Sequence, residues 1–118
     1  MFELMVEDSF DAAHALRNYN GPCENLHGHT WKVQVFLEGD KLNEIGLLED
    51  FKNIKQVLAA ILKEFDHTLL NDLKYFLAEN PSSENISKLI FRQIKNSLAL
   101  VKKVTVWESP RTSVTYWE

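Results

Sequence analysis

The chain opens with apolar and polar residues in alternation, apart from Met5. The apolar positions of this first segment are Phe2, Leu4, Val6, Phe10 and Ala12. A period of two predicts a β-strand with one buried face, and its continuation places His14 on the same face near the strand end. A second strand is expected from about His27 to Glu38, with Gly39-Asp40 ending it. The stretch Leu16–Leu26 between them contains Asn, Gly and Pro and is predicted to be a loop.

Two later segments have apolar residues at helical spacing, which predicts two amphipathic helices. The first covers about residues 50–65, and its apolar series is Phe51, Ile54, Val57, Leu58, Ile61, Leu62 and Phe65. The second follows Pro81-Ser82-Ser83-Glu84, in which a serine cap and a first-turn acid are typical of a helix start. Its apolar series is Ile86, Leu89, Ile90, Ile94 and Leu98.

The remaining residues predict two further strands. Val104 and Val106 begin the third strand, and the same face next presents Glu108. A turn over 109–112 leads into a short fourth strand, Ser113–Trp117, which is rich in β-forming residues. The order strand, strand, helix, helix, strand, strand predicts an α+β fold with a four-stranded antiparallel sheet and two helices on one face. We expect residues 1–118 to form one domain, because about 100–200 residues commonly share one core.

Composition narrows the class of protein. Apolar residues make up 45% and charged residues 25% of the chain, which is ordinary for a globular protein. The net charge of −4 argues against nucleic acid as the main partner. A single cysteine and an acidic N-terminal segment without signal-peptide features favour a cytoplasmic, reducing location. The longest strongly apolar stretch, Val57–Leu62, is far shorter than the roughly 20 residues of a membrane span.

Three of the four histidines have the spacing of metal ligands. His27 and His29 lie two apart on a predicted strand and therefore point the same way, and Gly28 between them adds no bulk. His14 is expected on the same face of a neighbouring strand. Three neutral imidazoles hold Zn²⁺ and leave a coordination position open, as catalytic zinc sites do. The alternative from the residues alone is two surface histidines and one buried near a strand end.

Four other residues are candidates for chemistry. Cys23 lies in the polar loop beside the histidines, where a nearby cation would favour its thiolate, although it could also be a fourth zinc ligand. Asp66-His67 follows the first helix, and a histidine there could simply complement the helix dipole. Glu108 continues an apolar face, where a carboxylate is costly unless it is paired or binds a ligand.

Five motifs, in order, resemble the family of 6-pyruvoyl-tetrahydropterin and 6-carboxytetrahydropterin synthases. They are Phe10-Asp-Ala-Ala-His14, Cys23-Glu-Asn-Leu-His27-Gly-His29, Asp66-His67-Thr-Leu-Leu70-Asn71, Pro81-Ser-Ser-Glu-Asn85 and Val106-Trp-Glu108-Ser109. The likeness covers nearly the whole chain. It implies the tunnelling fold, in which two-helix, four-stranded subunits assemble into an oligomeric barrel. The resemblance further implies a homo-hexamer, a dimer of trimers, with active sites at the subunit interfaces.

The resemblance also implies roles for these residues. His14, His27 and His29 would bind Zn²⁺, and Glu108 would anchor the pterin. Cys23 would be the general base, with Asp66 and His67 as a second proton-transfer unit from a neighbouring subunit. The enzyme would be a lyase acting on 7,8-dihydroneopterin triphosphate. In the carboxy-forming branch it would release triphosphate and acetaldehyde on the way to queuosine.

Several alternatives remain open at this point. Cys23 to His29 also reads Glu-x-x-His-Gly-His, which resembles a type III subgroup that makes 6-hydroxymethyl-7,8-dihydropterin for folate synthesis, with Glu24 as the base. The pyruvoyl branch is a further alternative. A non-catalytic zinc- or pterin-binding protein is the alternative of another class, against which the presence of Cys23, Asp66, His67 and Glu108 together argues.

Overall fold

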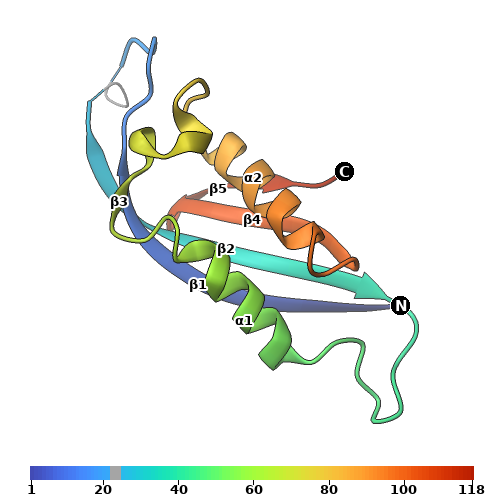
Figure 1. The fold of residues 1–118 in the computed structure, drawn as a ribbon. Helices are drawn as coiled ribbons and strands as arrows, with labels where there is room; N and C mark the ends of the chain where they lie inside the picture. Colours follow the sequence, from blue (N-terminus) through green and yellow to red (C-terminus); the bar gives the residue numbers. More distant parts are fainter. Residues whose placement is uncertain (22–24) are drawn as a thin grey trace.

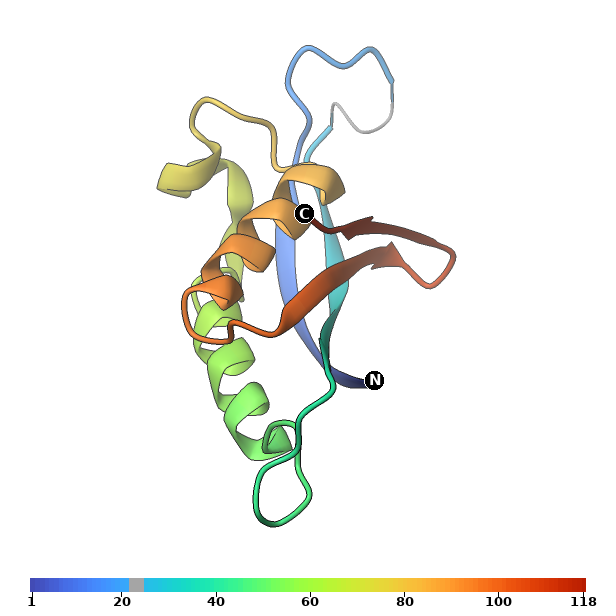
Figure 2. The same cartoon turned by 90° about the vertical axis from the view of Figure 1, so that its right-hand side faces the viewer.

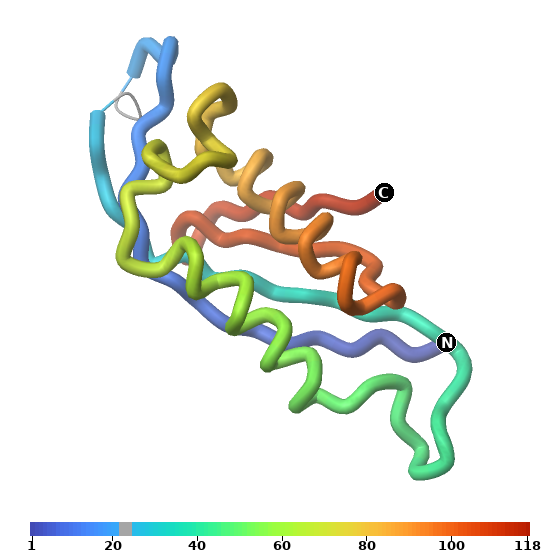
Figure 3. The backbone as a smooth tube through the Cα atoms, viewed as in Figure 1, coloured from blue at the N-terminus to red at the C-terminus, as the bar shows by residue number. Residues whose placement is uncertain are grey.

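A five-stranded sheet with two helices on one face makes up the structure, a computed structural model that describes residues 1–21 and 25–118 (Figure 1). The strands are β1 (Phe2–His14), β2 (His27–Gly39), β3 (Thr68–Leu69), β4 (Val101–Ser109) and β5 (Thr112–Tyr116), in the spatial order β3-β1-β2-β4-β5. The helices are α1 (Phe51–Leu62) and α2 (Ser83–Lys95). α1 packs along β1, and α2 packs on β4 and β5 (Figure 3). The turned view shows both helices on the same side of the sheet (Figure 2).

The core forms where the predicted apolar faces meet. Strand residues at every second position are buried against apolar helix residues three and four apart. The strand contribution includes Phe10, Trp31, Val33, Val35, Val104 and Val106, and the helix contribution includes Ile54, Leu58, Ile86, Ile90 and Ile94. The α+β class, the antiparallel pairing of the four long strands and the position of both helices are therefore confirmed.

The first helix ends three residues earlier than its apolar pattern predicts. Beyond Leu62 the chain turns, with the amide of Asp66 donating to the Leu62 carbonyl at 3.0 Å. His67 then adopts a left-handed backbone conformation with φ of 58°. Such a conformation is uncommon outside glycine and ends the helix direction. It allows the His67 amide to donate to the Asp11 carbonyl at 2.6 Å, so that the chain meets β1.

This turn adds a fifth strand that the sequence pattern does not predict. β3 has only two residues and pairs in parallel with β1, Ala12 opposite Thr68 and Ala13 opposite Leu69. Two short 3₁₀ segments follow, Leu70–Asp72 and Lys74–Phe76. The sheet is therefore mixed, with a short parallel strand at the edge beside β1. The second helix also ends early, at Lys95, and Leu98 is buried after the helix instead of within it.

β2 extends beyond its neighbour β4 at the end where the histidines lie. The whole of β2 pairs with β1, but its pairing with β4 runs only from Lys32 opposite Trp107 to Leu37 opposite Val101. Among the described residues, nothing pairs with the first residues of β2 on the β4 side, and this free edge borders the candidate site. No helix within the described parts of the chain is long and apolar enough to cross a membrane.

Candidate metal centre

The strand pairing brings the three histidines to one place on the helix-covered face. His14 is the last residue of β1 and lies opposite His27, the first residue of β2, while His29 lies opposite Ala12. The His14 ring centroid is 4.6 Å from that of His27 and 5.4 Å from that of His29. An imidazole nitrogen of each histidine and a carboxylate oxygen of Glu108 lie within 4.8 Å of one another. The chain thus has a group of side chains that could hold a metal ion.

Backbone carbonyls fix the orientation of two of these rings. Nδ1 of His14 donates to the Pro81 carbonyl at 2.7 Å, and Nδ1 of His27 donates to the Asn25 carbonyl at 2.6 Å. Because a carbonyl can only accept, each Nδ1 carries a proton, and in the neutral form of each ring Nε2 presents its lone pair inward. Metal-ligating histidines in proteins are commonly oriented in the same way, by a hydrogen bond from the other ring nitrogen.

The inward nitrogens have the separation that a tetrahedral cation requires. Nε2 of His14 and Nε2 of His27 are 3.1 Å apart. Two nitrogens at typical Zn–N distances in a tetrahedral site are about 3.3 Å apart. Nε2 of His29 is buried and has no hydrogen-bond partner within the described structure, although Oε1 of Glu108 is 3.0 Å away. Two facing lone pairs and one unpartnered buried nitrogen are unfavourable by themselves, so this donor set fits a bound cation.

Burial keeps His14 ready to act as a ligand. Only 2% of His14 is exposed, and its ring packs edge-on against Trp31 with centroids 4.8 Å apart. This burial lowers the pKa of His14 below the ordinary value of 6.5, an effect that its hydrogen bond to Pro81 and the charge of Glu108 partly oppose. A low pKa keeps the imidazole neutral near pH 7, and neutral imidazole is the form that binds metals.

Glu108 reaches the histidines from a β-bulge. In the β4–β5 pair, Trp107 lies opposite Ser113 and Ser109 opposite Thr112, so Glu108 has no partner of its own. Bulges of this kind often re-aim a side chain beside an active site. Oε2 of Glu108 accepts a hydrogen bond from the buried Ser83 hydroxyl at 3.0 Å, while Oε1 faces the histidines. Glu108 is therefore held in place from the first turn of α2.

A cavity opens at the free edge of β2, and we name it the β2–β4 notch. Its volume is about 470 Å³. It is lined by Gly28, His29, Thr30, Lys32, Trp107, Glu108, Ser109 and Pro110. The notch thus adjoins the metal centre through His29 and Glu108. Lys32 is its one lysine or arginine among the described residues, with Nζ 4.7 Å from the centre of the Trp107 ring.

Asp66 and His67 lie apart from the metal centre, beside β1. Oδ2 of Asp66 is 2.9 Å from Nδ1 of His67, and Oδ1 of Asp66 accepts a hydrogen bond from the Asp11 amide at 2.8 Å. That amide, followed by the bond to His67, lowers the pKa of Asp66 and keeps it ionised. The carboxylate thus holds a proton of His67 on Nδ1.

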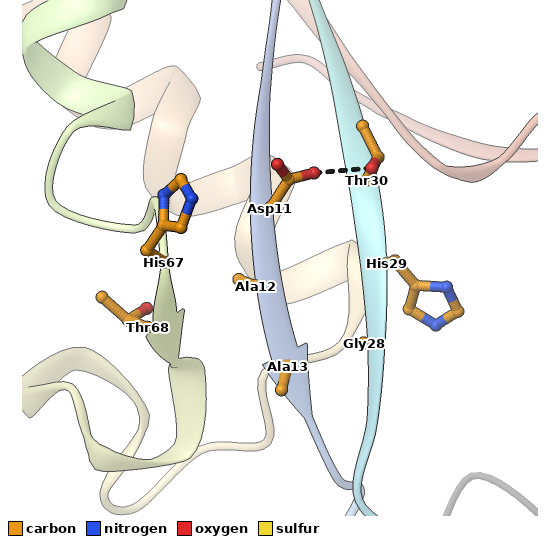
Figure 4. A pocket seen from close by; sticks show the side chains of 8 residues that line it. All are labelled: Asp11, Ala12, Ala13, Gly28, His29, Thr30, His67 and Thr68. Atoms are coloured by element: carbon orange, nitrogen blue, oxygen red, sulfur yellow. Dashed lines mark hydrogen bonds between the residues drawn. The ribbon is translucent and has the colours of Figure 1, made fainter.

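His67 lines a second cavity, which we name the β1–β3 pocket. Its volume is about 460 Å³, and its walls are Asp11, Ala12, Ala13, Gly28, His29, Thr30, His67 and Thr68. The Thr30 hydroxyl on β2 donates a hydrogen bond to Oδ1 of Asp11 on β1 at 2.5 Å. Figure 4 shows the His29 ring directed away from His67, on the far side of β2. The backbone of residues 28–30 therefore separates the two cavities.

The structure brings some of the predicted site residues together and leaves others apart. His14, His27, His29 and Glu108 form one group, whereas Asp66 and His67 form another. Cys23 and Glu24, the two proposed alternatives for the base, lie outside the described residues. The sequence reasoning missed Ser83 as the support of Glu108, although it recognised this segment as a helix start. It also missed Lys32 as a lining residue of the notch and Asp11 as a lining residue of the pocket, because the spacing of residues does not indicate either one.

Comparison with known proteins decides the family. The profile described as 6-pyruvoyl tetrahydropterin synthase matches residues 3–118. The chain belongs to the 6-pyruvoyl tetrahydropterin synthase family. The 6-carboxy-5,6,7,8-tetrahydropterin synthase of Haemophilus influenzae is 30% identical, and the match covers 100% of both chains. The dihydroneopterin monophosphate aldolase of Pyrococcus furiosus is 37% identical over 89% of this chain and 88% of its own length.

A solved structure supports the same assignment. The 6-pyruvoyl tetrahydropterin synthase of Caenorhabditis elegans matches with a TM-score of 0.91 and 28% identity, covering 99% of this chain and 95% of that one. The likeness confirms the predicted fold. The chain is accordingly an enzyme of the tetrahydropterin synthase type, a lyase.

Proposed function

We propose that this enzyme is a zinc-dependent 6-carboxy-5,6,7,8-tetrahydropterin synthase. Its substrate would be 7,8-dihydroneopterin triphosphate, and triphosphate and acetaldehyde would be released, as in the route to queuosine. The observation that carries this proposal is the match over the full length of both chains to the Haemophilus influenzae enzyme of that name. The grouping of three histidines and a glutamate beside an open notch supports it.

The proposed binding mode places the zinc and the pterin anchor next to each other, where His29 and Glu108 line the β2–β4 notch. His14, His27 and His29 would hold the zinc, with Nε2 of each ring as the donor atom. A bound zinc ion acidifies hydroxyl and adjacent C–H groups of a substrate side chain. Glu108 would accept hydrogen bonds from the pterin N–H groups, since a carboxylate can accept two parallel bonds from such an edge.

Proton transfer would then fall to Cys23 and to the Asp66–His67 pair. Nε2 of His67 is the free ring atom, because Nδ1 is held by the ionised Asp66. A histidine oriented by a carboxylate in this way can serve as a general acid or base. Cys23 would be the general base beside the metal, as its position in the Cys-x-x-x-His-Gly-His motif suggests.

The separation of Asp66–His67 from the histidine group supports an active site shared between copies of the chain. His67 lines the β1–β3 pocket and the metal centre adjoins the β2–β4 notch, on the two sides of residues 28–30. We propose that the His67 of one subunit serves the zinc of its neighbour. A homo-hexamer built as a dimer of trimers would also cover the sheet edges at β3 and β5.

Lys32 would contact the phosphate chain of the substrate. Lys32 makes no ion pair within the described residues, and the chain as a whole carries a net charge of −4. An anionic leaving group needs local positive charge, which this lysine supplies beside Glu108. Lys32→Met is expected to raise KM for the triphosphate about tenfold, the cost of one charge-assisted hydrogen bond, with little change for unphosphorylated dihydroneopterin. Lys55→Met, at an exposed position of α1, is the matched control.

A second function has specific support. The Pyrococcus furiosus relative is named as an aldolase acting on dihydroneopterin monophosphate. Glu24 stands three residues before His27, as in the Glu-x-x-His-Gly-His pattern. If Glu24 supplied the base, carbon–carbon cleavage to 6-hydroxymethyl-7,8-dihydropterin would be the alternative reaction.

One experiment separates these functions. Zinc-loaded protein is incubated with dihydroneopterin triphosphate and, separately, with the monophosphate, and the products are identified by mass. Carboxytetrahydropterin from the triphosphate is the expected result. Hydroxymethyldihydropterin would select the aldolase, pyruvoyl-tetrahydropterin the pyruvoyl branch, and binding without turnover a non-catalytic protein.

A further inference from the structure

We propose that Asn71 and Asn80 are positioning residues for the metal ligand His14. Their side-chain amides pair with the backbone that continues beyond β1, at the point where β3 ends. The inference rests on the proposed metal site, because it assigns to these residues a function in holding one ligand of that site.

Each asparagine pairs with one backbone residue as a neighbouring strand would. Oδ1 of Asn71 accepts from the Ala15 amide at 2.9 Å, and Nδ2 of Asn71 donates to the Ala15 carbonyl at 2.8 Å. Oδ1 of Asn80 likewise accepts from the Arg17 amide at 2.8 Å, and its Nδ2 donates to the Arg17 carbonyl at 3.0 Å. The paired residues are two apart, which is the repeat of a strand edge. We call the two asparagines and their four hydrogen bonds the amide ladder.

The ladder continues the edge that β3 begins. β3 pairs with β1 only at Ala12 and Ala13, and the chain then leaves in 3₁₀ turns. Without the amides, the groups of Ala15 and Arg17 would have no strand partner on that side. His14 lies between Ala13 and Ala15, so the ladder holds the backbone on the C-terminal side of this ligand.

The same ladder fixes the carbonyl that orients the His14 ring. Pro81, whose carbonyl accepts from Nδ1 of His14 at 2.7 Å, directly follows Asn80. The Asn80 carbonyl accepts from the Asn85 side chain at 2.9 Å, which ties this segment to the first turn of α2. Asn80 thus connects the β1 extension to Pro81, and the distance from His14 to its orienting carbonyl depends on this connection.

The side chain of Arg17 binds the segment that carries the two asparagines. Its guanidinium donates to three backbone carbonyls, those of Asn71 at 3.2 Å, Phe76 at 2.6 Å and Glu79 at 3.1 Å. These carbonyls belong to the irregular segment between β3 and α2. The guanidinium therefore keeps Asn71 and Asn80 at a fixed spacing, which both rungs of the ladder require.

The chemistry of the ladder requires asparagine. A carboxamide both accepts and donates, whereas an ionised carboxylate only accepts. Aspartate at position 80 would keep the bond from the Arg17 amide, lose the bond to the Arg17 carbonyl and place two oxygens against each other. Asn43 offers a matched comparison, because its Oδ1 only accepts, from the amides of Ile45 and Leu47 at 3.0 Å each. Aspartate at position 43 would keep both bonds.

The test measures zinc affinity, by competition with a chromogenic chelator, in Asn71→Asp, Asn80→Asp, Asn80→Ala and Asn43→Asp. Loss of a group that orients a metal ligand typically costs about 10–100-fold in metal affinity. We expect the Kd for zinc to rise about tenfold or more in the three ladder variants and to stay within about twofold in Asn43→Asp. Equal affinity in all variants would overturn the proposal. If one position does not tolerate change, the variant at the other amide gives the same comparison.

A second measurement does not depend on metal binding. The ¹⁵N shifts of the His14 ring in metal-free protein report which nitrogen carries the proton. The proton is expected on Nδ1 in the wild type and in Asn43→Asp, and distributed over both nitrogens in Asn80→Ala. An unchanged Nδ1–H form in Asn80→Ala would refute the ladder as the support of His14. Failure of the wild type to bind zinc, with these shifts as expected, would count against the proposed function and not against the ladder.

Discussion

Oε1 of Glu108 lies 3.0 Å from Nε2 of His29, although Glu108 comes from a β-bulge on β4 and His29 from the free end of β2. The same carboxylate is 3.7 Å from Nε2 of His14 and is held by Ser83. Two roles fit this position, a fourth metal ligand or an acceptor for the pterin. The proposed function assigns the second role, and the two make different predictions.

Glu108→Gln should weaken pterin binding and leave zinc content near one per chain. Glutamine keeps the shape of the side chain but removes the charge, so charge-assisted hydrogen bonds to the substrate are lost. Such bonds contribute about 1.5–3 kcal/mol, which corresponds to a rise in Kd of roughly tenfold to a hundredfold. Fluorescence titration with a pterin analogue and metal analysis of the same sample provide the test. Loss of zinc with unchanged pterin affinity would make Glu108 a metal ligand instead.

Each of the variants His14→Ala, His27→Ala and His29→Ala should have a zinc content well below one ion per chain. Three nitrogens are the minimum protein ligand set of a catalytic zinc site, and removal of one leaves the ion weakly held. Metal analysis after dialysis against a weak chelator is the measurement. His67→Ala is the control, because this histidine lies outside the group and should keep full zinc. Full occupancy in all three ligand variants would eliminate the site.

Cys23→Ala should keep zinc and lose release of triphosphate by about a hundredfold or more, the usual contribution of a positioned general base. Glu24→Gln should leave both nearly unchanged. Phosphate release from dihydroneopterin triphosphate and metal content are measured for each variant. The reverse pattern, with Glu24→Gln inactive and Cys23→Ala active, would transfer the role of base to Glu24 and favour the aldolase.

Coexpression of Cys23→Ala chains with His67→Ala chains should restore activity that neither variant has alone. If each site takes its zinc half from one subunit and His67 from another, about a quarter of the sites in a randomly mixed oligomer are intact. Turnover of the purified mixture is compared with that of each variant. Cys23→Ala mixed with Glu108→Gln is the control, because both changes affect the same half. No gain in the first mixture would show that His67 serves its own subunit.

The metal-free protein should lose stability as the pH falls below about 6.5. Burial lowers the pKa of His14 in the native state, so in this range the unfolded chain binds a proton that the native chain does not. The free energy of unfolding then rises with pH, and this contribution is fully present only above the unfolded pKa. Urea unfolding in chelator at about pH 5.5 and about pH 7.5 measures the slope. His14→Phe should reduce the dependence of the free energy of unfolding on pH. An equal slope in that variant would show that a group other than His14 causes the dependence.

The sequence predicts that the three histidines come together, because a period of two places them on one face of neighbouring strands. The pairing of His14 with His27 depends on the strand register, which the pattern does not fix. The alternation of Val104, Val106 and Glu108 also predicts the inward direction of the carboxylate. The positions of Asp66 and His67 could not be predicted in this way. They depend on the left-handed backbone of His67 and on a two-residue strand, which are too short to produce a periodic signal.

The amide ladder is equally absent from the hydrophobic pattern. Asn71 and Asn80 pair with Ala15 and Arg17 through side chains, across 56 and 63 residues of sequence. Local spacing cannot indicate such partners, because the connection exists only after the helices have packed. The family motif that contains Asn71 marks the residue without giving its physical function.

Residues 28–30 of β2 line both the notch beside the metal centre and the pocket that contains His67. Among the described residues, a side chain added at Gly28 would meet only the Ala12 carbonyl, at 3.9 Å, so this part of the fold leaves room for one. A substitution at residues 28–30 that changes the shape of one cavity will consequently also change the other. If the two cavities serve different active sites of an oligomer, a single substitution at this position would alter two reaction centres at once, and laboratory evolution of the enzyme should find few neutral changes there.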